Sequence, residues 1–414
     1  MKLPQVGSHC AKLGTWLWQG NPVKHRLERG GNFGDSGTSW PFFPKWPCLL
    51  DLSCPLLPPR LGFALDLPSG QEHGMGRILT ILGDGAWGSA MAWVLAQRPG
   101  RQVRLLGTRP QNTLQFQKTR ENARLLPGVK MPDSVTITVD PAEAFAETEA
   151  IFLAVPTQFL RTALKQFLAM RPAVGPDGRP VPVISLVKGI EIGSFLRPSE
   201  IVRQEWGDNT PVAILSGPSH AEEVARGLPA GVVVASDRGG LALWVQQVVG
   251  TDRFRVYTND DPVGVELGGA LKNVLGIAAG MADGLGLGDN AKSALITRGL
   301  AEISRCGVAM GAKAGTFAGL AGMGDLLTTC FSPHGRNRQV GEWLAKGETI
   351  ASIGAKTPKV AEGVTTTQAL VPLLDKIGIE MPIARAVHAV LFEGLAAREA
   401  AMGLLLRQQR PEDF

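Results

Sequence analysis

The chain has 414 residues, of which 44% are hydrophobic and 19% charged, and its formal net charge is +5. This composition is typical of a globular protein of two or three domains, and the scattered Lys and Arg residues argue against a nucleic-acid-binding protein. No apolar run reaches the roughly 18 residues of a membrane-spanning helix, no secretory core is evident, and the five cysteines lack disulfide or zinc spacing, so we expect a cytoplasmic, metal-free protein.

Residues 1–74 differ from the rest of the chain. They are rich in Trp and Pro and show neither a helical nor a strand period, whereas Met75 opens directly into an apolar run. Three interpretations stay open: a poorly ordered extension, a functional tail, or an upstream translation start with Met75 as the true first residue. We assign no chemistry to this segment.

Residues 75–260 alternate short Val/Ile/Leu-rich runs with helical stretches. Alternation of this kind predicts buried strands in a Rossmann-like doubly wound sheet. The predicted strands are 78–82, 103–106, 135–139, 151–155, 183–187, 212–215, 232–235 and 254–257.

Residues 261–414 lose the strand pattern and become rich in Ala, Leu and Gly at helical spacing. The predicted helices are 265–281, 291–310, 340–344, 365–377 and 383–391. We therefore predict an α/β fold: an N-terminal Rossmann-like domain at 75–260, followed by an all-α C-terminal domain at 261–414.

A glycine-rich loop follows the first predicted strand. Gly83, Gly85 and Gly88 match the GxGxxG pattern, and an Ala-rich helix begins directly after them. The first glycine permits a tight turn, the second lets a pyrophosphate approach the backbone, and the third allows close packing of helix on strand. The alternative is an ordinary strand-to-helix turn.

The end of the second predicted strand indicates which dinucleotide is preferred. An Asp or Glu there would bind the ribose 2′-hydroxyl of NADH, but the chain has Gly107, Thr108 and Arg109. Arg109 suits a 2′-phosphate, so NADPH is favoured and NADH remains open. Arg109 as an ordinary surface arginine is the alternative.

Two lysines lie in unusually apolar surroundings. Lys188 ends the fifth predicted strand, at the sheet edge where ligands bind, and Lys272 lies in a Gly/Ala/Val-rich helix. A buried lysine can manage the proton of a reacting carbonyl and stabilise developing charge on its oxygen. Asp325 is a candidate partner for Lys272; a lysine that snorkels from a core helix is the alternative.

Further polar groups lie at two predicted helix starts. Gly335, Arg336 and Asn337 offer a helix N-terminus and an arginine fork for a phosphate, or simply a basic cap. Ser219 follows the sixth strand, where it either admits a ligand or caps the next helix, and the neighbouring His220 is interpreted as structural. From the residues alone, the prediction is a nicotinamide oxidoreductase acting on a small phosphorylated alcohol.

These motifs together resemble the NAD(P)-dependent glycerol-3-phosphate dehydrogenase family, particularly its bacterial branch. GDGAWG, LVKGIE, LSGPSHAEE, VELGGALKNV, AGMGDLLTTC, GRNRQVG and VAEGVTT occur in the family's order between about residues 75 and 400. The resemblance implies reversible hydride transfer between NAD(P)H and dihydroxyacetone phosphate, giving sn-glycerol 3-phosphate for phospholipid synthesis. It leaves a homodimer open.

The resemblance also implies roles for individual residues. Lys272 would be the proton donor and acceptor beside Asp325, and Lys188 would touch both cofactor and substrate. The implied cofactor contacts are Gly83, Gly85, Ala86, Trp87, Gly88, Arg109, Lys188, Ala221, Arg336, Val360 and Glu362. The implied substrate contacts are Lys188, Gly217, Ser219, Lys272, Asp325, Gly335, Arg336 and Asn337.

The sequence departs from the family at Asp84, which stands in the glycine loop where alanine is more usual, and at the second strand end, where the family often has aromatic and basic residues. We expect the Asp84 side chain to point away from the pyrophosphate. Two rivals are a reductase for another hydroxy acid, which would need a carboxylate site in place of Arg336, and a non-catalytic NADPH sensor, which could lose both lysines.

Overall fold

The computed structural model describes residues 77–356, 361–408 and 411. These residues belong to one compact unit, Leu61–Phe414. The predicted extension at 1–74 and the implied cofactor residue Val360 lie outside the described residues.

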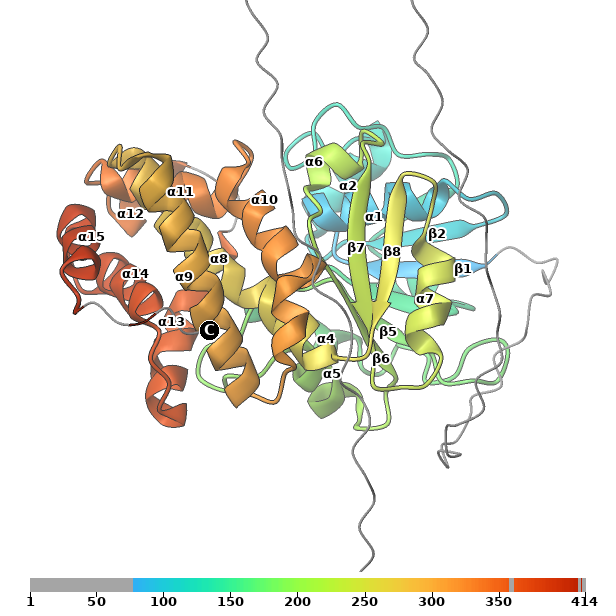
Figure 1. Ribbon diagram of the computed structural model, residues 1–414. Coiled ribbons are helices and arrows are strands. Elements are labelled where there is room, and N and C mark those ends of the chain that lie inside the picture. Colours follow the sequence, from blue (N-terminus) through green and yellow to red (C-terminus); the bar gives the residue numbers. More distant parts are fainter. Residues whose placement is uncertain (1–76, 357–360, 409–410, 412–414) are drawn as a thin grey trace, which may run out of the picture. The chain divides into compact units, whose positions relative to one another are not determined.

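The described part of the α/β region contains one eight-stranded sheet, ordered β3-β2-β1-β4-β5-β6-β7-β8 (Figure 1). All eight predicted strands are present, with shifts of a few residues at their ends. The first six follow the 3-2-1-4-5-6 order of a dinucleotide-binding sheet. The strands are β1 (Ile78–Leu82), β2 (Gln102–Leu106), β3 (Val135–Thr138), β4 (Ala150–Leu153), β5 (Val183–Ser185), β6 (Val212–Ser216), β7 (Ala230–Ala235) and β8 (Phe254–Asn259).

The strand β7 departs from the parallel arrangement, because it pairs antiparallel with β6. Between these two strands the chain forms only the four-residue helix α6 (Ala221–Val224). The chain therefore turns back from the edge that it has just reached instead of crossing over the sheet. The helix α7 (Leu241–Val249) then crosses back, so β8 runs parallel to β7.

Helices cover both faces of the sheet. Alternate strand residues point to opposite sides, so Leu79 and Ile81 pack with α1, α6 and α7, whereas Leu82 packs with α3, α4 and α5. The remaining helices of this region are α1 (Ala86–Ala96), α2 (Pro110–Thr119), α3 (Pro141–Phe145), α4 (Thr157–Phe167) and α5 (Pro198–Trp206).

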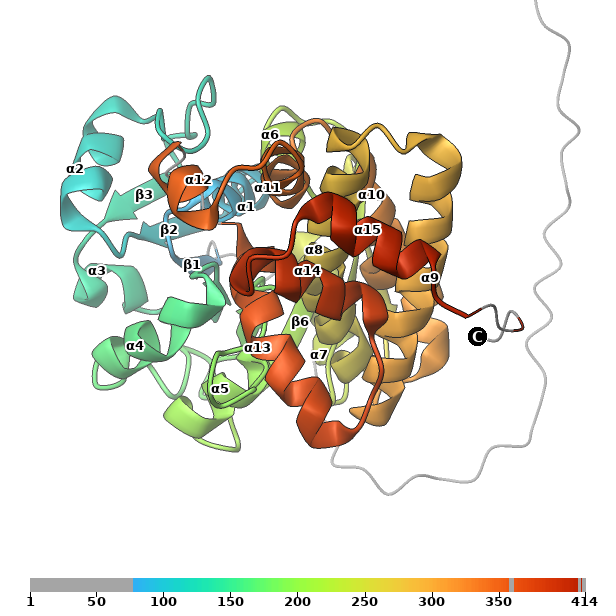
Figure 2. The ribbon, with the colours of Figure 1, turned by 90° about the vertical axis from the view of Figure 1, so that its left-hand side faces the viewer.

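After Asn259 the described chain is helical, and the long helix α8 (Pro262–Gly284) is buried along most of its length. Helices α9, α10, α11 and α13 contact it (Figure 2). A Cβ atom on Gly280 would lie 1.9 Å from the Arg338 carbonyl oxygen, so α8 and α11 are in backbone contact. The other elements are α9 (Gly288–Ala309), η1 (Ala314–Ala318), η2 (Leu320–Gly324), α10 (Asp325–Phe331), α11 (Arg336–Ala345), α12 (Ile350–Lys356), α13 (Glu362–Ile377), α14 (Pro382–Phe392) and α15 (Ala397–Leu405).

The five predicted C-terminal helices correspond to α8, α9, α11, α13 and α14, whereas α10, α12, α15 and the short segments η1 and η2 were not predicted. The helix α8 also contacts β6 and β7, which brings its lysine to the carboxyl ends of the parallel strands. Within the described ranges no helix has both the length and the apolarity needed to cross a bilayer.

Candidate active site

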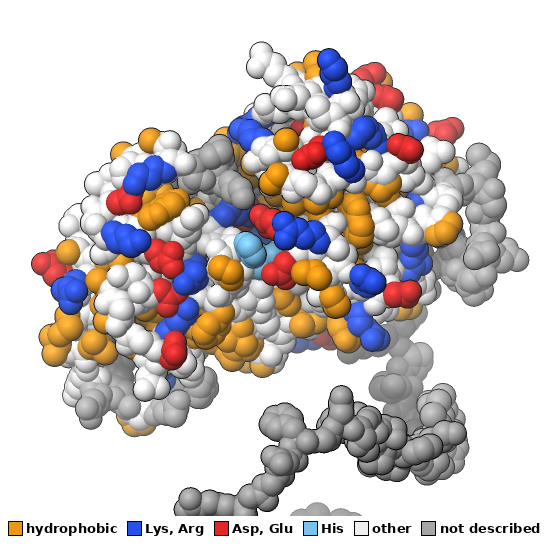
Figure 3. Space-filling model, turned by 90° about the horizontal axis from the view of Figure 1, so that it is seen from above, with side chains coloured by type: hydrophobic (Ala, Val, Ile, Leu, Met, Phe, Trp, Pro, Cys, Tyr) orange, Lys and Arg blue, Asp and Glu red, His pale blue; other side chains and the backbone are white. Residues whose placement is uncertain are grey.

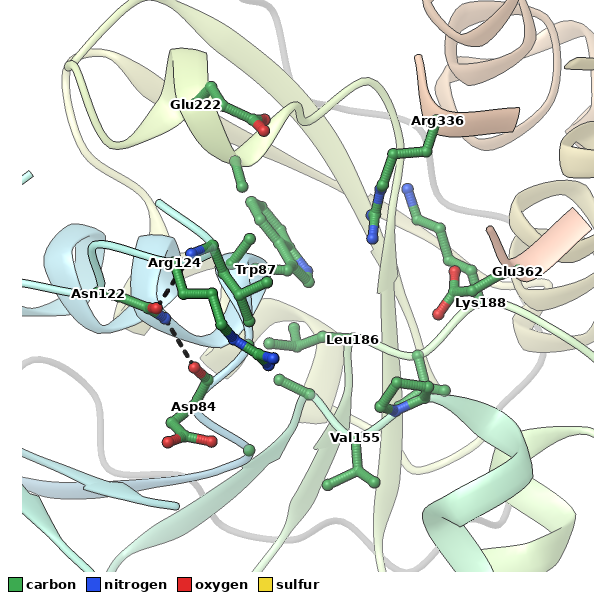
Figure 4. A pocket seen from close by; sticks show the side chains of 18 of the residues that line it. Asp84, Trp87, Asn122, Arg124, Val155, Leu186, Lys188, Glu222, Arg336 and Glu362 are labelled. Carbon is green, nitrogen blue, oxygen red and sulfur yellow. Dashed lines mark hydrogen bonds between the residues drawn. The ribbon is translucent and has the colours of Figure 1, made fainter. Parts of the chain in front are cut away.

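A cavity of about 930 Å³ lies at the carboxyl ends of the central strands (Figure 4). The glycine loop, the start of α2, the segment after α2, the loop after β5, and residues of α8, α10, α11 and α13 all contribute to its wall. It therefore joins the predicted cofactor residues to the predicted catalytic and phosphate-binding residues. Of the predicted site residues that the structure describes, Gly88 and Gly217 do not line it.

Glycine is needed at each of the three loop positions for a different structural reason. Gly83 has φ of +113° and packs against the backbone of Ala154, and a Cβ atom on Gly88 would lie 1.9 Å from the Gly83 carbonyl oxygen. A Cβ atom on Gly85 would meet nothing within 4 Å, so Gly85 leaves open space beside the start of α1. Gly85 is also the N-cap of α1 and makes no side-chain cap, which leaves amide groups of that helix for an anion. The loop therefore fits a dinucleotide pyrophosphate.

Ala86, Trp87 and Ala221 line the cavity beside this loop, and Arg109 lines it as the N-cap residue of α2. Asp84, the carboxylate within the loop, accepts a hydrogen bond from the buried Thr113 hydroxyl at 2.6 Å. The carboxylate is thus directed at α2, and Figure 4 shows it pointing away from the other labelled side chains.

Lys188 and Lys272 share one carboxylate. The Nζ atom of Lys188 lies 2.6 Å from Asp325 Oδ2, and the Nζ atom of Lys272 lies 2.9 Å from Asp325 Oδ1. Lys272 also donates to the Thr329 hydroxyl at 2.5 Å. The prediction that Lys188 ends a strand is wrong, since β5 ends at Ser185; Lys188 lies three residues further, in the loop at the same sheet edge.

Burial and charge act in opposite directions on this group. Burial lowers the pKa of Lys272, Asp325 raises it and Lys188 lowers it, and the pKa lies below its usual value. Burial would raise the pKa of Asp325, but Lys188 and Lys272 together hold that pKa below its usual value. Asp325 is therefore ionised, and Lys272 releases its proton more readily than a surface lysine.

The predicted phosphate site lies at the start of α11, which begins at Arg336, four residues before the predicted helix 340–344. Gly335 is the N-cap and contributes no side-chain cap. The Asn337 amide donates to Asn273 Oδ1 at 2.9 Å and accepts from the Gly363 amide at 3.0 Å. The Asn337 side chain thus ties α8, α11 and α13 together.

Glu362, the first residue of α13, lines the same cavity. Burial raises its pKa, while Arg336, Lys188 and Lys272 oppose that rise. Figure 4 shows Arg336 and Lys188 near Glu362 at one end of the cavity. The positive charges of Arg336, Lys188 and Lys272 therefore favour the ionised form of Glu362.

Gly217 lies behind Lys188 and does not reach the cavity surface. Its carbonyl oxygen accepts from Lys188 Nζ at 3.1 Å and from the Ser219 hydroxyl at 2.8 Å. The interpretation of Ser219 as a cap of α6 is wrong, because the N-cap is His220 and makes no side-chain cap. Ser219 itself lines the cavity.

Sequence reasoning missed several polar groups around the cavity. Thr329 accepts from Lys272, the Asn273 Nδ2 atom is buried without a hydrogen-bond partner, and the His220 Nε2 atom is likewise unpaired. Burial and the neighbouring Lys272 lower the pKa of His220. The LKN run contained a signal for Asn273, which directly follows Lys272, but nothing in the sequence placed His220 beside that lysine.

Two family models match most of the chain. The model for the NAD-dependent glycerol-3-phosphate dehydrogenase N-terminus matches residues 78–242, and the model for the C-terminus of the same family matches residues 261–402. The chain belongs to the NAD-dependent glycerol-3-phosphate dehydrogenase family. The resemblance, the fold class and the NAD(P)-dependent oxidoreductase class expected from the sequence are thereby confirmed.

Individual relatives support the same family assignment. A glycerol-3-phosphate dehydrogenase (NAD(P)+) of Prosthecochloris aestuarii is 44% identical over 337 residues, which cover 81% of this chain and 99% of the relative. One from Mycobacterium tuberculosis is 43% identical over 340 residues, covering 82% and 99%. The solved glycerol-3-phosphate dehydrogenase of Coxiella burnetii is 37% identical with a TM-score of 0.76, covering 80% of this chain and 99% of that one.

Proposed function

We propose that this chain catalyses reversible hydride transfer between NAD(P)H and dihydroxyacetone phosphate, giving sn-glycerol 3-phosphate, with Lys272 as the proton donor and acceptor. One observation carries the residue assignment. The glycine loop, the two lysines on Asp325 and the start of α11 all line a single cavity. Family membership supports the substrate and the reaction.

A bound nicotinamide supplies or accepts the hydride. The glycine loop and the start of α1 would hold the dinucleotide pyrophosphate, with Ala86, Trp87 and Ala221 along its sides and Glu362 at the nicotinamide end. Arg109, the N-cap residue of α2 three residues beyond β2, suits a 2′-phosphate, so NADPH is the preferred cofactor and NADH the alternative.

The start of α11 would bind the substrate phosphate. The backbone amides of Arg336 and Asn337 lie in the first turn of that helix, and the helix dipole favours an anion there. The Arg336 side chain adds a fork of donors that points into the cavity (Figure 4). Because the Asn337 side chain is already hydrogen-bonded, its share of phosphate binding comes from the backbone.

Lys272 would then transfer the proton. In the reductive direction the ammonium of Lys272 donates to the carbonyl oxygen, and in the oxidative direction the neutral amine takes the proton back. Asp325 and Thr329 fix the position of the amine, and Lys188, held by Asp325 and Gly217, adds positive charge where the oxygen becomes negative.

The test is oxidation of NADPH by dihydroxyacetone phosphate, with wild type and Lys272→Ala measured in parallel. We expect turnover by the wild type and a loss of several orders of magnitude in Lys272→Ala, with the dissociation constant for NADPH unchanged. A wild type that binds the cofactor but turns over with neither NADPH nor NADH would reject the substrate. Turnover of small oxo acids in the same assay would favour the hydroxy-acid reductase instead.

The wider assignments are also part of the proposal. We divide the chain into a cofactor domain at 75–260 and a substrate domain at 261–414, preceded by an extension at 1–74. On the face drawn in Figure 3, Lys and Arg are interspersed with Asp and Glu, which suits a small-molecule substrate better than a nucleic acid. We also propose that the protein is a cytoplasmic homodimer that supplies glycerol 3-phosphate for phospholipid synthesis. Light scattering tests the homodimer, and cell fractionation tests the cytoplasmic location.

A further inference from the structure

The segment 121–125, which follows α2, places an arginine at the cavity. Arg124 is exposed and lines the cavity together with the glycine loop. Figure 4 shows its side chain extending from this segment toward the middle of the cavity. Neither the sequence motifs nor the proposed mechanism gives this residue a role.

The position of this segment is fixed by Asn122. The Asn122 amide donates to the Asp84 carbonyl oxygen at 2.8 Å and to the Ser89 hydroxyl at 3.0 Å, and its Oδ1 atom accepts from the Leu125 amide at 3.3 Å. The Asn122 residue is only 8% exposed. The segment is therefore attached directly to the loop and helix that would hold a pyrophosphate, and Arg124 starts two residues from the attachment point.

Three of the other cations of the cavity wall pair with carboxylates, whereas Arg109 lines the wall as the N-cap residue of α2. Lys130 pairs with Glu121 at 3.0 Å, and Lys188 and Lys272 share Asp325. Arg336 lies at the start of α11, at the substrate end. In the part of the chain that the structure describes, no hydrogen bond or ion pair engages the Arg124 guanidinium.

A bound dinucleotide would provide an anionic partner for the Arg124 guanidinium. The pyrophosphate of a dinucleotide carries two negative charges. A guanidinium presents paired donors that match phosphate oxygens, and such charge-assisted bonds are stronger than neutral ones. The amides at the start of α1 meet the pyrophosphate from the loop, whereas Arg124 reaches the same cavity from a different element.

We propose that Arg124 binds the pyrophosphate of the dinucleotide and that Asn122 is the residue that positions it. This inference rests on the proposed cofactor function. Its consequence is specific: Arg124 strengthens the binding of NADH and NADPH equally, because both carry the pyrophosphate. Arg109, the N-cap residue of α2, would instead act only on the 2′-phosphate of NADPH.

The experiment measures dissociation constants of the full chain for NADH and NADPH by isothermal titration calorimetry, without substrate. Wild type, Arg124→Met and Arg124→Lys are compared, with Arg109→Met as the matched control. We expect Arg124→Met to weaken both cofactors by the same factor, about tenfold to a hundredfold, as expected for loss of a charged hydrogen bond. Arg124→Lys should retain part of the affinity, and Arg109→Met should weaken NADPH alone.

Two results would overturn the assignment. A loss confined to NADPH would place Arg124 at the 2′-phosphate, and unchanged affinities for both cofactors would remove it from the site. Unchanged thermal unfolding of the free protein is the check that Arg124→Met is folded, which the exposure of Arg124 makes straightforward. Cofactor binding without turnover of dihydroxyacetone phosphate would reject the proposed substrate and leave this inference standing.

The positioning role of Asn122 has its own readout. Asn122→Ala should weaken both cofactors in the wild-type background but add little in the Arg124→Met background, because the same interaction has already been lost. Equal losses in the two backgrounds would show that Asn122 acts independently of Arg124. Thermal unfolding of each variant separates this coupling from a general loss of stability.

Discussion

Asp325→Asn should move the pH dependence of both reaction directions toward lower pH. The carboxylate lies 2.9 Å from Lys272 and 2.6 Å from Lys188, and it raises the pKa of Lys272 against burial and against Lys188. Two unit charges about 3 Å apart interact by about 5 kcal/mol at an effective dielectric constant of about 20. Opposite charges at such distances shift pKa values by about one to three units in proteins, each unit being about 1.4 kcal/mol.

The direction of the shift follows from the two roles of Lys272. Reduction needs the ammonium form, so this activity is lost as the pH rises through the pKa of Lys272. Oxidation needs the neutral amine, so this activity appears over the same pH range. Because Asp325→Asn removes the negative charge beside Lys272, both transitions should occur about one to three pH units lower in the variant than in the wild type.

The assay is kcat/KM against pH for both directions, followed by absorbance of the reduced nicotinamide. The matched control is Thr329→Val, which removes the hydroxyl bound to Lys272 and keeps every charge; its transitions should move much less. A lower kcat/KM at all pH values, with the two transitions unmoved, would refute the electrostatic role of Asp325. Loss of one partner from a buried pair also costs about 3–5 kcal/mol of stability, so the profiles are read where the variant is folded.

Three further predictions concern cofactor space and stability. Gly85→Ala should weaken NADH binding and leave unfolding by urea unchanged, because its Cβ atom would enter open space beside α1. Gly88→Ala should lower the unfolding free energy by about 1–3 kcal/mol, because its Cβ atom would lie 1.9 Å from the Gly83 carbonyl oxygen; equal stability of the two variants contradicts this. Burial raises the pKa of Glu302 to about 7, although the Ile383 and Ala384 amides oppose the rise, so wild-type stability should fall by about 3 kcal/mol as the pH rises from about 4.5 through 7. The unfolding free energy of Glu302→Gln, measured by urea unfolding at a series of pH values, should lack this decrease. An equal decrease in both proteins would exclude Glu302 as its source.

The strands could be predicted from the sequence because each buried strand is a short apolar run bounded by breakers. The antiparallel direction of β7 could not, because its run Ala230–Ala235 has the same composition as a parallel strand. Its direction depends on the short connection through α6, where the chain turns back at the sheet edge. Similarly, β5 ends at Ser185 although its apolar run continues through Val187.

The short helix α10 was missed because its seven residues are too few to display a helical period. It nevertheless carries Asp325 as its first residue. The sequence suggested Asp325 as a partner of Lys272, but the pairing with Lys188, 137 residues away, needed the structure. Asn122 is a similar case, because its bond to Asp84 joins positions 38 residues apart.

Sharing one carboxylate between two lysines reconciles two requirements of the reaction. A phosphorylated substrate and a developing oxyanion both favour positive charge, whereas proton transfer favours an amine whose pKa lies below that of a surface lysine. With Asp325 ionised, the two ammonium groups and the carboxylate together carry one net positive charge. A second ionised carboxylate on this group would remove that charge and raise the pKa of Lys272, and burial raises the pKa of the neighbouring Glu362. With no carboxylate, two buried ammonium groups would repel one another. The arrangement of one aspartate between two lysines therefore retains positive charge for the substrate while Lys272 keeps a lowered pKa.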